Sequence, residues 1–119
     1  MGEGIGVTVN SYSEVTEGYY YCRPGDTARS VSGVVYGDKN RYAGLLKANP
    51  EVWDTGDMLV VPGVRGRVTD VHAGESAVRV IGRVYPNQPV HLSQNRFYAW
   101  NGGASRKFTG GEVVFIPAR

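Results

Sequence analysis

The side chains best able to carry out chemistry are few and widely spaced in this chain. It contains one cysteine, Cys22, and two histidines, His72 and His91. Neither histidine has cysteines or acidic residues at metal-site spacing, and Cys22 has no evident base or redox partner. We find no Ser-His-Asp, Cys-His or paired-carboxylate arrangement. The sequence therefore predicts a non-enzymatic protein without metal or cofactor. Cys22 is expected to be a small buried hydrophobe, and the histidines structural or on the surface.

A run of polar and glycine residues occurs twice. Residues 22–27 read Cys-Arg-Pro-Gly-Asp-Thr, and residues 72–76 read His-Ala-Gly-Glu-Ser. The two glycines lie 49 positions apart, Asn49 matches Asn101 at a spacing of 52, and residues 59–62 match residues 114–117 at a spacing of 55. This pattern indicates a tandem duplication with short insertions in the second copy.

The first copy predicts the order strand, helix, helix, strand. Residues 19–23 are rich in strand formers and end at a Pro-Gly turn. Either Asp26 or Thr27 can cap the helix that follows, and Gly37 can end it in the left-handed conformation.

A second helix is expected between that glycine and the Asn49-Pro50 pair, which disfavours helix continuation. Asn40 can cap this helix, and Leu45 and Leu46 lie on its apolar face. Residues 58–61 then form the closing strand.

The second copy follows the same plan. We expect a strand at 68–72, a helix at 77–84, a second helix capped by Ser93 that carries Phe97 and Trp100, and a last strand at 113–116.

The elements together predict an α+β fold of two tandem βααβ domains, each a two-stranded antiparallel sheet with both helices on one face. The expected boundaries are an extended N-terminal arm at 1–18, a first domain at 19–63 and a second domain at 64–119. The join at 63–67 is short, so we expect the domains to touch. The arm alternates Val7, Val9, Tyr12 and Val15 with polar or small residues. It suits either strand addition to another chain or packing on its own first domain.

Charge is distributed unevenly over a chain whose net charge is only +2. Residues 1–63 carry five basic and eight acidic side chains, whereas residues 64–119 carry eight basic and three acidic ones. The second half is therefore expected to attract acidic partners or the first half of a neighbouring copy. No basic run is interleaved with aromatic residues, so no nucleic-acid partner is expected. No segment reads as an export leader or membrane span.

The order of motifs resembles a LysM domain. Tyr-x-x-x-Pro-Gly-Asp-Thr, Tyr-Gly-Asp, Asn-Pro and Gly-Asp-Met-Leu-Val-Val-Pro follow one another within residues 19–62. Residues 68–117 are similar but degenerate, with Gly-Glu-Ser, Tyr-Pro-Asn, Trp-Asn-Gly and Gly-Glu-Val-Val-Phe-Ile-Pro. The resemblance implies a βααβ fold that binds N-acetylglucosamine polymers, peptidoglycan or chitin, without catalysis. Some members of the family instead serve as adaptor domains in phage tails and related particles.

The resemblance also implies a shallow sugar groove between the first strand–helix loop and the second helix–strand loop. In the first domain it would be formed by Gly25, Asp26 and Thr27 on one wall and by Asn49, Pro50 and Glu51 on the other, with Trp53 offering an apolar ring. In the degenerate second domain the matching residues are Gly74, Glu75, Ser76, Asn101 and Gly102. Each set also has a structural interpretation, because turns, helix caps and buried aromatic anchors use the same residue types.

Two functions remain open. The first is a structural adaptor, a minor virion component on a capsid or tail that is made in the host cytoplasm and binds capsid or tail proteins or further copies of itself. The second is a cell-wall-associated module that binds peptidoglycan or chitin through its first domain. The eroded second groove and the uneven charge favour the adaptor.

Overall fold

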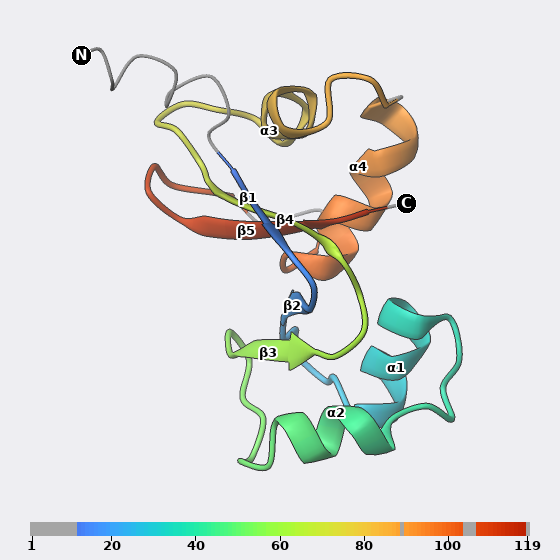
Figure 1. Ribbon diagram of the computed structural model, residues 1–119. Coiled ribbons are helices and arrows are strands. Elements are labelled where there is room, and N and C mark those ends of the chain that lie inside the picture. Colours follow the sequence, from blue (N-terminus) through green and yellow to red (C-terminus); the bar gives the residue numbers. More distant parts are fainter. Residues whose placement is uncertain (1–11, 89, 104–106, 119) are drawn as a thin grey trace, which may run out of the picture.

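The computed structural model describes residues 12–88, 90–103 and 107–118. This part of the chain is a small α+β fold with four helices and two small antiparallel sheets (Figure 1). Each half has the order strand, helix, helix, strand, and the two strands of each half pair with each other.

The first sheet has two strands. Strand β2 (Gly18–Tyr21) pairs antiparallel with β3 (Met58–Val61), with Gly18 opposite Val61 and Tyr21 opposite Met58. Helices α1 (Ala28–Tyr36) and α2 (Ala43–Ala48) lie between these strands in the chain. Thr27 caps α1, and Gly37 ends it with a φ of +71°. The closing strand predicted at residues 58–61 is confirmed, because β3 covers the same residues.

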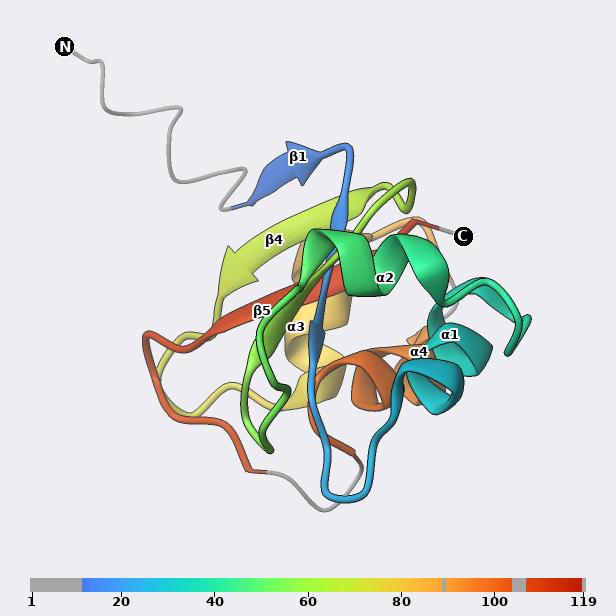
Figure 2. The same ribbon diagram turned by 90° about the horizontal axis from the view of Figure 1, so that it is seen from below.

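The second sheet has three strands, and the prediction of two was wrong. Its order is β1 (Ser13–Val15), β4 (Gly66–Asp70) and β5 (Val113–Pro117), all antiparallel to their neighbours. Helices α3 (Ala77–Val84) and α4 (Val90–Trp100) connect β4 to β5. The added strand β1 lies along the outer edge of β4 (Figure 2) and comes from the segment predicted to be an arm.

Arg67 of β4 holds this added strand in place. Its guanidinium lies between the rings of Tyr12 and Tyr85, 4.4 and 4.5 Å from their centroids. Its Nη2 donates to Glu14 at 3.2 Å, and its Nη1 donates to the carbonyl of Val84 at 2.6 Å. Residues 12–15 are thus attached to the second sheet of their own chain. Val15 also packs against the core of the first half, so the expected packing on the first domain holds for that residue. Val7 and Val9 lie outside the described residues.

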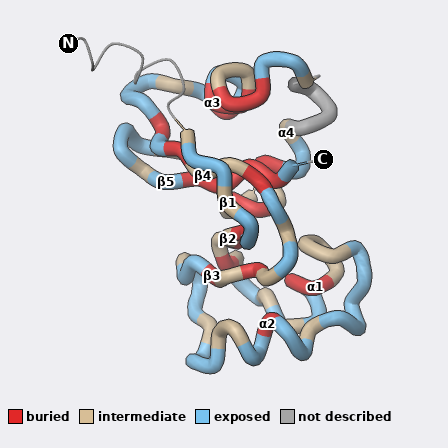
Figure 3. The backbone as a smooth tube through the Cα atoms, viewed as in Figure 1, coloured by how far each residue is buried: buried red, intermediate tan, exposed pale blue. Residues whose placement is uncertain are grey.

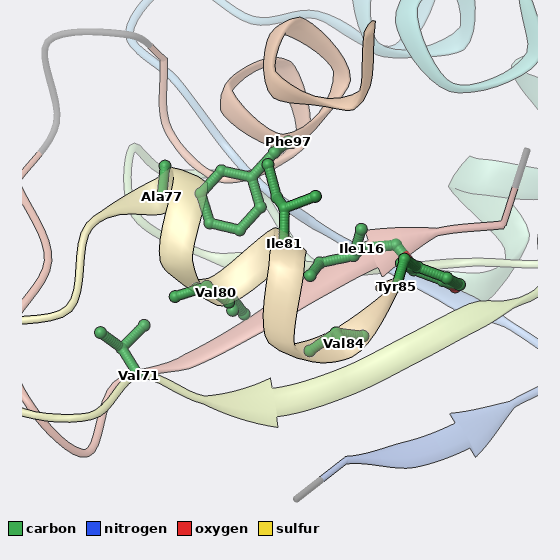
Figure 4. Packing of buried hydrophobic residues seen from close by; sticks show 9 residues of the cluster. Val71, Ala77, Val80, Ile81, Val84, Tyr85, Phe97 and Ile116 are labelled. Atoms are coloured by element: carbon green, nitrogen blue, oxygen red, sulfur yellow. The ribbon is translucent and has the colours of Figure 1, made fainter. Parts of the chain in front are cut away.

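Two clusters of buried side chains form the core. The cluster of the second half lies between α3, α4 and one face of β5 (Figure 4); its buried members are Val71, Ala77, Val80, Ile81, Val84, Tyr85, Phe97, Val114 and Ile116. The cluster of the first half contains Tyr20, Cys22, Val31, Leu45, Leu59, Val61, Trp100 and Phe115.

Trp100 and Phe115 belong to the second half of the sequence but pack in the core of the first. Val114 and Ile116 of β5 belong to the cluster with α3 and α4, whereas Phe115 between them belongs to the other cluster, so both faces of this strand are buried. The tube of β5 is accordingly coloured as buried along most of its length in Figure 3. The ring centroids of Trp100 and Phe115 are 5.1 Å apart. The two clusters are therefore joined through α4 and β5, which contribute side chains to both.

Some predicted details were wrong. Asn40 does not cap α2, whose N-cap residue Tyr42 makes no side-chain cap hydrogen bond, and the Asn40 backbone instead donates to the Asp38 carboxylate. Leu46 is exposed, because successive residues of a helix point about 100° apart and Leu45 is the one that faces the core. Helix α4 begins at Val90, before the predicted cap at Ser93.

Candidate functional site

The first predicted wall is a tight turn whose polar atoms are largely used by the fold. Gly25 has a φ of +80°. The carboxylate of Asp26 accepts hydrogen bonds from the Arg23 backbone at 2.9 Å and from the Tyr20 hydroxyl at 2.7 Å, and its side chain is only 7% exposed. Burial, followed by the hydrogen bond to Asp26, raises the pKa of Tyr20. The hydroxyl of Thr27 accepts from the backbone of Ser30 at 3.2 Å and caps α1.

The second copy builds the same turn, with Glu75 in place of Asp26 and Ser76 in place of Thr27. Gly74 has a φ of +76°, and Glu75 accepts from the His72 backbone at 2.9 Å. Ser76 caps α3 by accepting from the backbone of Arg79 at 3.3 Å. Glu75 therefore makes the same hydrogen bond as Asp26, because each carboxylate accepts from the backbone N–H of the residue three positions earlier.

Glu75 has one partner that its counterpart lacks, the guanidinium of Arg83. Two bonds of 2.8 and 2.7 Å join them, and the Glu75 side chain is 10% exposed. Hydrogen bonding from Arg83, reinforced by the His72 backbone, lowers the pKa of Glu75 to about 2 against the opposing effect of burial. The carboxylate is therefore ionised and fully engaged at neutral pH.

The two predicted asparagines make matching sets of three hydrogen bonds. Asn49 donates to the carbonyls of Leu45 and Val60 at 3.0 and 2.8 Å, and it accepts from the Val60 amide at 2.8 Å. Asn101 donates to the carbonyls of Phe97 and Phe115, both at 2.8 Å, and it accepts from the Phe115 amide at 3.2 Å. Each side chain thus joins the end of a helix to the last strand of its own half.

The remaining residues of the predicted first groove differ in exposure. Trp53 is half-buried against the first core, and its indole donates to the carbonyl of Asn49 at 2.9 Å. Pro50 and Glu51 are exposed, as is Val52 beside them. The accessible atoms of this wall therefore belong mainly to Pro50 and Glu51, because Trp53 is half-buried and the side-chain amide of Asn49 is hydrogen-bonded within the fold.

The second predicted groove is divided in the structure. Gly74 and Glu75 line a shallow recess of ≈ 390 Å³ together with His72, Ala73 and Arg79. Asn101 is 1% exposed, and its backbone forms an isolated parallel β-bridge with Tyr21 of β2. It therefore lies at the junction of the two halves. Gly102 follows it and is half-buried.

A second feature, an apolar groove between the two sheets, was not predicted from the sequence. It has a volume of ≈ 270 Å³ and is lined almost entirely by apolar atoms of Val15, Tyr19, Met58, Val68, Val113 and Phe115, with Ser13 and Val114. All five strands contribute to it. The available signal in the sequence was an apolar residue directly after a Gly-Asp or Gly-Glu pair, Met58 and Val113, and the structure shows both to be exposed. The groove itself depends on the unforeseen position of β1.

Three further observations bear on function. Among the described residues, no group of three or more His, Cys, Asp or Glu side chains could hold a metal ion. None of the helices in the described part of the chain is long and apolar enough to cross a membrane. A scan of protein-family models, a search of curated proteins and a search of solved structures each found no match to this chain.

Proposed function

We propose that this chain is a non-enzymatic structural adaptor built from two tandem βααβ units of the LysM type, and that it docks on a larger particle such as a phage capsid or tail. The observation that carries the proposal is the use of Asp26, Glu75, Asn49 and Asn101 within the fold. These residues carry the resemblance to a sugar-binding family. Their matching internal bonds in both halves account for their presence without a ligand.

The junction between the halves supports the same proposal. Trp100 and Phe115 cross into the core of the first half, so the two units present their surfaces at one fixed orientation. An adaptor gains from such a fixed orientation, because a preorganised surface loses less freedom on binding.

The uneven charge indicates which half of the molecule would face the particle. The second half carries the excess of basic side chains, including Arg65, Arg79 and Arg96, which are all exposed. An acidic surface on the particle would attract this half, and the rate of docking would fall as salt is raised.

The alternative function is binding of peptidoglycan or chitin by the first unit. It is favoured by the exposure of Pro50 and Glu51 and by the open space around Gly25, where no atom beyond the adjacent residues lies within 4 Å of the position that a Cβ would take. Backbone groups at a glycine turn can approach an acetamido group closely.

Sedimentation with insoluble peptidoglycan and chitin at low salt separates the two functions. The adaptor predicts no more protein in the pellet than with cellulose. Retention that is lost in a Pro50→Ala/Glu51→Ala variant, but kept in a control with the distant exposed substitution Val78→Ser, would establish the sugar site instead.

The adaptor also requires a positive result. Particles purified by density gradient from the organism that makes the chain should contain it at a constant ratio to the major particle protein, as measured by mass spectrometry. Its absence from such particles would overturn the proposal.

A further inference from the structure

The apolar groove between the sheets exposes large apolar side chains to solvent, although residues of this type are usually buried. Met58 is 41% exposed and Val113 is 51% exposed, and both line the groove. Its floor is formed by the buried Phe115 and the half-buried Val68. The lining offers almost no hydrogen-bonding group, so an occupant must be held by apolar side chains.

The volume of the groove restricts the kind of occupant. At ≈ 270 Å³ it lies just below the range of roughly 300–1,000 Å³ typical of small-molecule pockets. It is flanked by strand β1, which is the outer strand of its sheet. A narrow apolar trough beside an edge strand suits an extended peptide that inserts alternate side chains.

The chain itself supplies such a segment at the rim of the groove. Ser13, the first residue of β1, lines the groove, so the preceding residues depart from this point. The sequence there reads Ile-Gly-Val-Thr-Val from Ile5 to Val9, which places three aliphatic side chains at alternate positions. Asn10 and Ser11, which separate it from β1, are residue types favoured where a chain reverses.

We infer that the apolar groove between the sheets is a docking site for this chain's own segment Ile5–Val9. Ile5 precedes Ser13 by eight residues, a length of chain that spans at most about 28 Å when extended. The short tether gives the segment an effective local concentration on the order of millimolar, which free partners rarely reach.

Met58 provides a direct probe of the groove. The chain contains two methionines, so 13C-methyl-methionine NMR gives a simple spectrum in which Met58→Leu assigns the groove signal. A nitroxide attached to a Thr8→Cys variant should abolish the Met58 methyl signal, and reduction of the nitroxide should restore it. Cys22 is 2% exposed and burial raises the pKa of its thiol, so the wild-type chain treated with the same reagent is the labelling control.

Two mixtures identify which chain supplies the segment. When a chain carrying both labels is diluted into excess unlabelled protein, docking within one chain predicts that the loss of signal persists. When a chain with 13C-methionine only is mixed with a chain carrying the nitroxide only, it predicts no loss. Loss in the second mixture would show that a second copy occupies the groove and would overturn the inference.

A substitution tests the apolar contact without any attached label. Val7→Asp should shift the Met58 methyl signal, because the charged side chain cannot occupy an apolar groove. Thr8→Asp, with the same charge at the alternate position, should leave the signal in place. Equal shifts in both variants, or no shift in either together with no broadening by the nitroxide, would contradict docking of the segment.

Discussion

At the scale of single residues, the two asparagines show how a repeated motif can serve folding. Strands β3 and β5 each have a residue whose backbone N–H and C=O both bond to an asparagine side chain, at Val60 and at Phe115. The side chain thereby acts as one residue of a neighbouring strand. It satisfies the edge of the sheet and leaves no unpaired backbone groups at these positions.

We predict that Asn101→Ala costs more stability than Asn49→Ala. Each variant loses the three hydrogen bonds described above, but Asn101 and its partners Phe97 and Phe115 are all buried. Asn49 and its partner Val60 are only half-buried. The expected losses in the free energy of unfolding are about 3 kcal/mol or more for Asn101→Ala and about 1–2 kcal/mol for Asn49→Ala. Urea denaturation of both variants measures the difference, and equal losses would contradict the argument.

The pair Glu75–Arg83 predicts a dependence of stability on acid. The folded pKa of Glu75 is about 2, below its ordinary value of 4.5, so the ionised form is favoured by folding. Its contribution is complete above pH 4.5 and disappears as the pH falls toward 2. A shift of this size corresponds to no more than about 3 kcal/mol.

The matched variant is Glu75→Gln. Wild type should lose more free energy of unfolding than this variant between about pH 5 and pH 2, because the variant has no carboxylate to protonate. If urea midpoints for the two proteins fall in parallel over that interval, Glu75 does not carry the effect.

At the scale of elements, regular local patterns made most of the fold predictable. The boundaries of α3 and β3 follow from apolar spacing and from the Gly-Glu-Ser and Thr-Gly-Asp turns, and both were confirmed. The position of β1 could not be derived in this way. It depends on a long-range contact with Arg67, and three residues of strand carry no periodic signal of their own.

The candidate site was less predictable than the fold. Glycine turns and helix caps can be predicted from residue types, and Thr27 and Ser76, which were among the predicted cap residues, do cap their helices. Whether a polar side chain is free for a ligand depends on neighbours distant in sequence. Asn101 bonds to Phe115, and Glu75 bonds to Arg83, and neither partner could be identified from spacing.

The surroundings of Gly66 in β4 and Gly82 in α3 predict that alanine substitutions at the two positions have opposite effects on stability. A Cβ at Gly66 would lie 2.5 Å from both the Ile116 carbonyl and the Phe115 ring. A Cβ at Gly82 in helix α3 would have no atom within 4 Å apart from its chain neighbours and the backbone of its own helix. Gly66→Ala should therefore destabilise the protein by about 1–3 kcal/mol. Gly82→Ala should stabilise it by about 0.5–1 kcal/mol. Thermal unfolding of the two variants decides, and a stable Gly66→Ala protein would contradict the close packing of β4 against β5.

At the scale of the whole molecule, the contribution of α4 and β5 to both clusters predicts that the two halves unfold together. A Trp53→Phe variant retains Trp100 as its one tryptophan, located where the halves meet. Its fluorescence and its far-ultraviolet circular dichroism should change at the same urea concentration. Trp100→Ala should lower stability by about 3–5 kcal/mol. Two separate transitions in the Trp53→Phe protein would show that each half has an independent core.

The placement of β1 and β5 on either side of β4 has a mechanical consequence. The chain enters this sheet at Ser13, toward the Asp70 end of β4, and leaves it after Pro117, opposite Gly66 at the other end. A pull on the two ends of the chain therefore acts along the strands, and it loads the hydrogen bonds of both ladders simultaneously in shear. The first unit lies between β1 and β4 in the chain and is bypassed by this force. If the protein is anchored at both ends, the first unit stays folded under tension as long as the three-stranded sheet β1-β4-β5 bears the force.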